Sequence, residues 1–532
     1  MDDTRVCIPA HPEGELQKRT VDTDLVTPVQ AVETFGGKVL VRWDPDAAVT
    51  SFAPVTYFIE FLKANGLWQK WVEDCPLSYR SGNAPPKQDI LGTILLSVLA
   101  GHKRYAHVTT IRSDSVLPGL LAMERVRSED AVRRAFLKGD SQAYANWLHQ
   151  HLDHSYQALL SEPWILDVDG SVKPLYGGQE QAVCGYNPTK HGRPSHVYQT
   201  YFIAAIRLVL DVEVQAGNQT ASAYARPELW KWLDRRPREQ WPKLVRGDIG
   251  WGTENMMVDC EKRNLPYLFK VRQTTHVKRH IAQLWGRGDW VSAGGDWQGR
   301  RSELRLTGWS CSRPVVVLRR RVKAPRALAA ASGTEAQQEL FTPDERFGTV
   351  EVLEAGELYE YAILVTSLAE PVLGVAQLYR DRAEAENVFD ELKNQWGWAG
   401  FTTQDERRCQ IMARMVALIY NWWSLFTRLA IPNRHTEATT SRPLLLHGIG
   451  RQTTHANQTT LTITSNHAQA NPIRRALETV SHLLQTLAET AERLSLEQRW
   501  HWLLRFIFRD WLTTRSPEPA LLPLPALADC RI

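Results

Sequence analysis

The stretch WILDVD, residues 164–169, marks the point where the sequence changes from helical spacing to strands that alternate with helices. Its β-branched and aromatic character recurs in HVYQTYFIAAI (196–206) and LVLDVEV (208–214), which predicts three successive strands. Beyond them, ASAYARPELWKWLDRR and TENMMVDCEKRN have helical spacing, whereas KLVRGD and PYLFKVR have the composition of short strands. This alternation indicates an α/β fold with a mixed sheet.

The chain before this stretch has a different texture. Residues 36–155 carry apolar side chains at three- and four-residue spacing, which predicts a helical domain, with Ser128 at one helix start. Residues 1–35 lack such periodicity, and we expect a flexible lead-in there. The first part of the α/β core then covers residues 156–272.

The chain after the first part of the core changes texture twice more. Residues 273–358 combine alternating stretches with glycines and an Ala-rich run, which predicts a β-rich insertion. YEYAILVTSL (359–368) has the composition of a returning buried strand and opens the second part of the core, residues 359–430. Residues 431–532 are expected to be helical, interrupted by a Thr-, Asn- and His-rich loop at 451–471.

Composition sets broad limits on the class of protein. The 532 residues include 63 basic and 59 acidic side chains and are 43% hydrophobic, as in soluble globular proteins. The seven cysteines are scattered, with no close pair that would clamp zinc, so we expect reduced thiols. The longest apolar run, residues 415–426, is far below the roughly 20 residues that a membrane span needs, and a buried core helix is the better interpretation.

LYRDRAEAENVFDELKNQW (378–396) carries the most specific pattern in the chain. If it forms one helix, Tyr379, Arg382, Glu386 and Lys393 lie within a stripe roughly 60° wide, since successive residues turn by about 100°. A carboxylate flanked by cations suits a site where metal and phosphate meet, because the acid binds the metal and the cations neutralise phosphate oxygens. A surface helix with ion pairs is the alternative, since further acids lie in the same stretch.

Two other carboxylates follow predicted strands. Asp169 is followed by Gly170 and Ser171, and Asp248 by Ile249 and Gly250. Acids at the carboxyl ends of strands stand where α/β folds build sites, and a third acid from a helix completes an oxygen cage for two Mg²⁺ ions. A turn or helix-capping role is the alternative for each aspartate taken alone.

In order and context, LDVDGS, VRGDIG and the Tyr, Arg, Glu, Lys pattern resemble the DDE transposases of bacterial insertion sequences, in the group defined by that four-residue signature. The resemblance covers about residues 160–425. It implies a ribonuclease-H-like core interrupted by the β-rich insertion, and a DNA-binding role for the helical domain at 36–155. It also implies that Asp169, Asp248 and Glu386 are the catalytic, metal-binding acids, and that Tyr379, Arg382 and Lys393 contact DNA.

The same resemblance implies how such a protein works. Two Mg²⁺ ions, with Mn²⁺ as a substitute, activate water and then a DNA 3′-hydroxyl for attack on phosphodiesters. The implied partners are double-stranded DNA, both terminal inverted repeats and target, and a second copy of the chain on paired ends. The implied location is the bacterial cytoplasm, on the nucleoid and not at a membrane. A structure-specific nuclease and a DNA-binding protein without catalysis are the alternatives.

One choice within the triad stays open on the residues alone. Asp167 shares a strand face with Asp169, because side chains alternate with period two. We prefer Asp169, since the order acid, small residue, hydroxyl that it begins is closer to the family pattern.

Basic and aromatic residues complete the expectations for DNA. Lys173, Lys190 and Arg193, placed in a loop after the first acid, are predicted to bind DNA. A run of arginines at 319–321 and four tryptophans of the insertion are further candidates, with a solvated edge and core packing as the alternatives.

Overall fold

The computed structural model describes residues 29–44, 46–79, 81–187, 190–322, 352–354, 357–432, 434–464, 469–490 and 493–513. It divides into two compact units, Met1–Ala48 and Val49–Ile532. In the first unit, β1 (Gln30–Thr34) and β2 (Gly37–Val41) form an antiparallel hairpin that sequence periodicity did not indicate. Gly37 adopts φ 103° in its turn, a conformation that only glycine adopts readily.

The second unit begins with the predicted helical region. Its helices are α1 (Val55–Ala64), α2 (Leu67–Asp74), α3 (Lys87–Leu99), α4 (Leu117–Leu120), α5 (Glu129–Ala135) and α6 (Ser141–His154). Ser128 caps α5 by accepting a hydrogen bond from the backbone N–H of Ala131, as its position predicts. The expectation of helices in this region is therefore confirmed.

The α/β core follows, and its sheet has the predicted class. Its elements are β4 (Ile165–Pro174), β6 (Pro194–Ile203), β7 (Leu208–Ala216), α7 (Arg226–Asp234), β8 (Leu244–Gly247), α8 (Glu254–Lys262) and β9 (Tyr267–Lys270). The strands lie in the order β7-β6-β4-β8-β9, with β6 antiparallel to both neighbours and β8 and β9 parallel to β4. This is the strand order of the ribonuclease H fold, as expected.

The insertion is β-rich, but its strands do not form a separate sheet. It contributes α9 (Thr275–Gln283), β10 (Val291–Gly294), β11 (Trp297–Leu304), β12 (Arg313–Arg321) and β13 (Val352–Glu354). The returning strand of the core expected at 359–368 is β14 (Glu357–Thr366). β14 pairs with β9 on one side and β12 on the other, so the core sheet continues into the insertion. The Ala-rich run lies outside the described residues.

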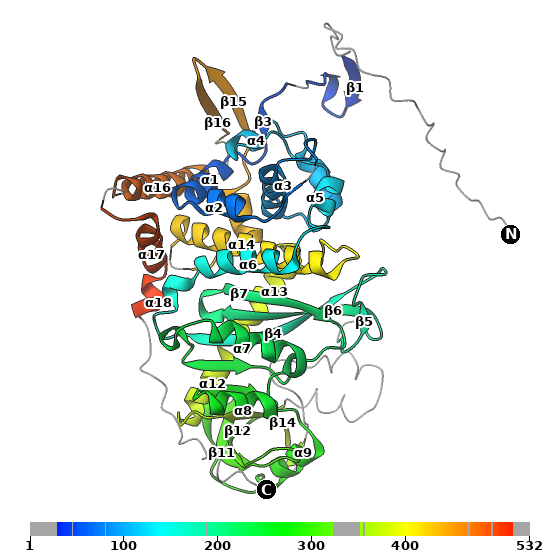
Figure 1. The fold of residues 1–532 in the computed structure, drawn as a ribbon. Coiled ribbons are helices and arrows are strands. Elements are labelled where there is room, and N and C mark those ends of the chain that lie inside the picture. Colours follow the sequence, from blue (N-terminus) through cyan, green and yellow to red (C-terminus); the bar gives the residue numbers. More distant parts are fainter. Residues whose placement is uncertain are drawn as a thin grey trace, which may run out of the picture. The chain divides into compact units, whose positions relative to one another are not determined.

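The helix α14 (Glu406–Ala430) packs against both α6 and β7 (Figure 1). It contains the longest apolar run, and its residues from Cys409 to Thr427 are buried except Gln410, as expected of a core helix. The Asn421 side chain fastens it to the sheet by accepting from Val209 N–H at 3.0 Å and donating to Val209 O at 2.8 Å. Among the described helices, none combines the length and apolar character of a membrane span.

The C-terminal part corrects one expectation. It contains α15 (Ala438–Leu445), β15 (Gly450–His455), β16 (Gln458–Ile463), α16 (Ala470–Glu489), α17 (Leu496–Ile507) and α18 (Arg509–Thr513). The loop expected at 451–471 is wrong for residues 451–463, because β15 and β16 form a hairpin that also pairs with β3 (Val49–Thr50). Ala456 and Asn457 both have positive φ, as two-residue hairpin turns require.

Candidate active site

The register of two parallel strands brings the predicted aspartates side by side. On β4 and β8, Asp167 is paired with Arg246 and Val168 with Gly247, so the next level joins Asp169 to Asp248. Both are on the same face of the sheet, because side chains alternate along a strand. Asp248 follows the last residue of β8, and its Oδ1 accepts the backbone N–H of Gly250 at 2.9 Å. The local turn thus holds this carboxylate at the strand end.

Asp167 has a different environment, although it lies only two residues away. It is fully buried and pairs with the guanidinium of Arg246, which is also buried. The backbone N–H of Ala204 donates to its Oδ2 at 3.3 Å. Asp167 is therefore the countercharge of a buried arginine, whereas the charges of Asp248 and Glu386 act on Asp169.

The helix predicted at 378–396 is two helices, so the expectation of one continuous stripe is wrong. They are α12 (Val372–Arg380) and α13 (Ala383–Asn394), with Asp381 and Arg382 at the bend. In a continuous helix the carbonyl of Leu378 would accept the N–H of Arg382. Arg246 takes that carbonyl instead, and Arg382 N–H bonds Tyr379 O at 3.2 Å.

The bend directs Arg382 toward the first acid. Its guanidinium is 2.5 Å from Asp169 Oδ2, and both side chains are buried. Asp169 Oδ1 accepts the backbone N–H of Gly170 at 2.8 Å. Arg382 is thus a partner of a predicted metal ligand, at the position predicted to contact DNA.

The charges of the three predicted acids act on one another. Burial is the main cause that raises the pKa of Asp169 to about 7, and the carboxylates of Asp248 and Glu386 raise it further. Arg382 and the Gly170 N–H oppose that shift. The strand ends and α13 therefore bring Asp169, Asp248 and Glu386 within electrostatic range, and a cation among them would relieve their repulsion.

The other two signature residues differ in exposure. Tyr379 is 4% exposed and packs in a small apolar cluster that also contains Val375 and Leu364. Burial is the main cause that raises the pKa of Tyr379, and the charges of Asp248, Asp169 and Glu386 add to it. Lys393 is half-buried on α13, near its end.

One residue predicted to bind DNA is misplaced by the sequence interpretation. Lys173 does not lie in a loop: it belongs to β4, is 4% exposed and donates from Nζ to Gly400 O at 2.6 Å and to Tyr198 Oη at 3.1 Å. Burial lowers the pKa of Lys173 to about 8. Its ammonium is used inside the fold, so we withdraw it as a DNA contact.

Lys190 and Arg193 do lie in the connection between β4 and β6, and both are exposed. Their cations stand over the ring of Tyr176, at 5.6 Å and 4.7 Å from its centroid. Tyr176 is 67% exposed. Two cations and an exposed aromatic ring therefore share one surface.

The insertion's candidates are mostly engaged with each other. The guanidinium of Arg319 lies 4.0 Å from the Trp290 ring centroid, and that of Arg320 lies 5.0 Å from Trp297. Trp297 and Trp309 are buried and Trp285 and Trp290 are half-buried, so packing accounts for all four.

A second acidic cluster was not foreseen. His149 on α6 and Asp211 and Glu213 on β7 place ligand-type atoms within 4.8 Å of one another, a compactness that the predicted triad does not have among the described residues. Arg414 of α14 bonds both acids, at 2.8 Å from Asp211 Oδ1 and 2.6 Å from Glu213 Oε1. No local pattern could reveal this cluster, because its members come from three distant parts of the chain.

Comparison with known proteins gives one family. The family model described as "Transposase DDE domain group 1" matches residues 80–485. Among solved structures, a similar one is the cryo-EM structure of the piggyBac transposase synaptic complex with hairpin DNA, at 10% identity and a TM-score of 0.35, covering 90% of this chain and 87% of that one. Among curated proteins, none matches.

Proposed function

Because this chain belongs to the family of transposases with a DDE domain of group 1, we propose that it cleaves the ends of its own element and joins them to target DNA. The catalytic residues in this proposal are Asp169, Asp248 and Glu386. Two observations support this choice: the β4–β8 register, which sets Asp169 and Asp248 at neighbouring strand ends, and the effect of the Asp248 and Glu386 charges on the pKa of Asp169.

The donor set fits a divalent metal. Three carboxylates offer hard oxygen ligands of the kind that Mg²⁺ and Mn²⁺ prefer, and the acids that raise the pKa of Asp169 leave negative charge that a cation would offset. We propose that Asp169, Asp248 and Glu386 hold two Mg²⁺ ions, with Mn²⁺ as a substitute. Bound there, the metal would activate water or a 3′-hydroxyl for attack on a phosphodiester.

The surrounding cations have separate roles in this proposal. Arg382 holds Asp169 in place through their 2.5 Å ion pair and is close enough to bond a phosphate oxygen at the same site. Lys393 supplies a second cation from the same helix. Tyr379, whose ring and hydroxyl oxygen are both buried, has the role of positioning Arg382 rather than of contacting DNA.

DNA is the proposed partner, both as element ends and as target. Lys190 and Arg193, with the Tyr176 ring between β4 and β6, offer cations and a stacking face beyond the carboxyl end of β4. Two copies of the chain on paired ends, in the bacterial cytoplasm with the nucleoid, complete the proposal.

The test is Mg²⁺-dependent cleavage of duplexes that carry the DNA flanking the reading frame, followed by joining of the cut ends to a plasmid. Wild-type protein is expected to do both, and Glu386→Gln neither. Cleavage without joining would favour a structure-specific nuclease. Binding without cleavage by the wild-type protein would favour a DNA-binding protein without catalysis.

A further inference from the structure

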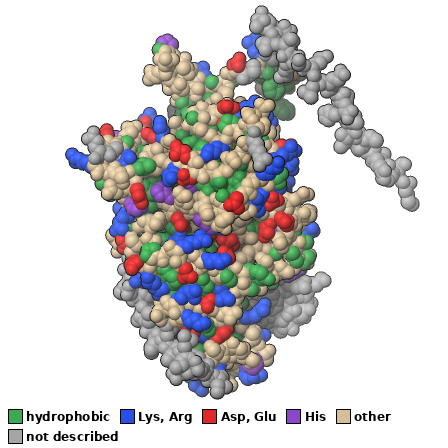
Figure 2. All heavy atoms as spheres, in the orientation of Figure 1, with side chains coloured by type: hydrophobic (Ala, Val, Ile, Leu, Met, Phe, Trp, Pro, Cys, Tyr) green, Lys and Arg blue, Asp and Glu red, His purple; other side chains and the backbone are tan. Residues whose placement is uncertain are grey.

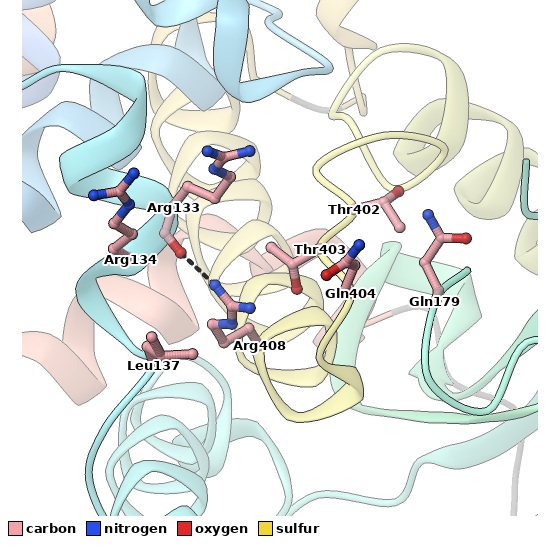
Figure 3. Close-up of a pocket in the computed structure, with 8 residues that line it drawn as sticks. All are labelled: Arg133, Arg134, Leu137, Gln179, Thr402, Thr403, Gln404 and Arg408. Atoms are coloured by element: carbon pink, nitrogen blue, oxygen red, sulfur yellow. Dashed lines mark hydrogen bonds between the residues drawn. The ribbon is translucent and has the colours of Figure 1, made fainter. Parts of the chain in front are cut away.

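A cavity of about 400 Å³ opens between α5, the connection from β4 to β6, and the start of α14 (Figure 3). Arg133 and Arg134 of α5 and Arg408 of α14 line it on one side. Polar side chains line it elsewhere, among them Gln179, Thr402 and Gln404. The walls thus come from the helical region and from the core.

Hydrogen bonds between these segments fix the walls. Arg408 donates to the carbonyl of Arg133 at 2.7 Å, and the backbone N–H of Glu180 donates to Gln404 O at 2.8 Å. The Lys173 ammonium, bonded to Gly400 O, ties the same loop to β4. A cavity bounded in this way is formed before any ligand arrives, which lowers the entropy lost on binding.

The charge of the lining is positive. Its ionisable residues are the three arginines, and no carboxylate lines it. The acids nearest to them lie behind the wall: Asp130 is 2.5 Å from Arg133 and 3.5 Å from Arg134, and Asp405 is 3.2 Å from Arg408. The charged groups of the lining itself are therefore all cations. On the face shown in Figure 2, by contrast, Lys and Arg are interspersed with Asp and Glu.

Such a lining suits a phosphate group. Guanidinium groups bind phosphate oxygens in paired hydrogen bonds, and hydroxyl and amide groups add neutral donors of the kind that contact DNA backbones. Arg133 and Arg134 have side chains that are 51% and 69% exposed, so they can reach a ligand at the mouth. Arg408, 13% exposed, provides a fixed cation deeper inside.

The position relates the cavity to the candidate active site. Lys173, which holds its loop, lies four residues after Asp169 on β4, or about 13 Å along the strand.

We infer that this cavity binds a backbone phosphate of the DNA that is held at the candidate active site. The inference rests on the proposed function, because it takes DNA as the ligand. The cavity is lined by both α5 and the core. A phosphate bound there would therefore contact both, and the contact between α5 and the core would help to position the DNA relative to Asp169.

The experiment measures binding of the full-length protein to a labelled duplex by fluorescence anisotropy, across a series of salt concentrations. The double variant Arg133→Gln/Arg134→Gln removes two exposed cations of the cavity. The matched control, Arg474→Gln/Arg475→Gln, removes two adjacent arginines from α16. Thermal melts of both variants check that the fold is kept.

We expect the cavity variant to bind about tenfold more weakly, equally for two unrelated duplex sequences, and its log-log salt slope to fall by about 1 to 2. The control should keep the wild-type slope. An unchanged salt slope in the cavity variant, or an equal loss of DNA affinity in the control, would overturn the inference. The proposed function would still stand if the wild-type protein cleaves DNA. Failure of the wild-type protein to bind duplex DNA at all would contradict both.

Discussion

Two clusters of acids lie on the same core sheet, and they differ in how many of their acids pair with the arginine of the cluster. In the β7 cluster of His149, Asp211, Glu213 and Arg414, the Arg414 guanidinium bonds both carboxylates and His149 Nε2 lies 2.9 Å from Asp211. The triad cluster consists of Asp169, Asp248, Glu386 and Arg382. There the arginine pairs with Asp169, while the charges of Asp248 and Glu386 raise the pKa of Asp169.

The comparison shows that compactness alone does not mark a metal site. The β7 cluster is the tighter group, yet Arg414 bonds both of its carboxylates, and Arg414 and His149 lower the pKa of Asp211 below its ordinary value against the effect of burial. It joins α6, β7 and α14. We therefore interpret it as a structural joint and assign the metal to the triad cluster, where negative charge is in excess.

The largest expected effect comes from neutralising the triad. Asp248→Asn and Glu386→Gln should each lower Mg²⁺-dependent DNA cleavage by at least about 10³-fold, because each removes a metal ligand. Both should keep or slightly raise the melting temperature, since repulsion around Asp169 falls. Single-turnover cleavage and a thermal melt measure the two effects. Loss of the fold in either variant would make the triad a structural cluster like the other.

Arg414→Ala should have the reverse profile. It leaves Asp211, 2% exposed, as a buried charge without its main partner, which costs about 3–5 kcal/mol of unfolding free energy. Chemical denaturation measures this. DNA cleavage per folded molecule should stay near the wild-type value. A drop in cleavage without loss of stability would show that the β7 cluster takes part in catalysis.

Asp167→Asn distinguishes the role of Asp167 from that of Asp169, its neighbour on β4. The buried Arg246 loses its countercharge but keeps a hydrogen-bond acceptor, so we expect a loss of about 2–3 kcal/mol in unfolding free energy. Cleavage by the folded fraction should persist. If Asp167→Asn is stable and inactive, Asp167 is the first acid and our choice of Asp169 is wrong.

The smallest effect is expected from Glu213→Gln. Burial, with Asp211 beside it, raises the pKa of Glu213 to about 7 against the opposing charge of Arg414, so a neutral isostere should cost less than about 1 kcal/mol at pH 7. A carboxyl whose pKa is raised in the folded state stabilises it below pH 4.5 and loses that contribution as the pH rises through 7. Wild-type stability relative to Glu213→Gln should therefore fall between about pH 5 and pH 8. A rise over that range would contradict this.

The strands of the core follow from local patterns, because stretches such as WILDVD carry their signal within a few residues. The three proposed acids come from similarly short motifs. The partners of these acids do not. Arg246 matters because the β4–β8 register sets it against Asp167 and its reach to the Leu378 carbonyl breaks the expected helix. Lys173 was misassigned for the same reason, since its hydrogen-bond acceptor is Gly400, far along the chain. The Arg246–Asp167 pair, the break in the expected helix and the Lys173–Gly400 bond all depend on contacts between residues far apart in the chain. The local spacing of residue types does not predict such contacts.

The central claim is that a divalent metal binds at Asp169, Asp248 and Glu386 rather than at the β7 cluster. Replacing Mg²⁺ with Fe²⁺, in the presence of ascorbate and peroxide, generates hydroxyl radicals that cut the polypeptide near the bound ion. The fragment ends, mapped by mass spectrometry, are expected around residues 169, 248 and 386 and to disappear in Glu386→Gln. Cuts around residues 149, 211 and 213 instead would contradict the account.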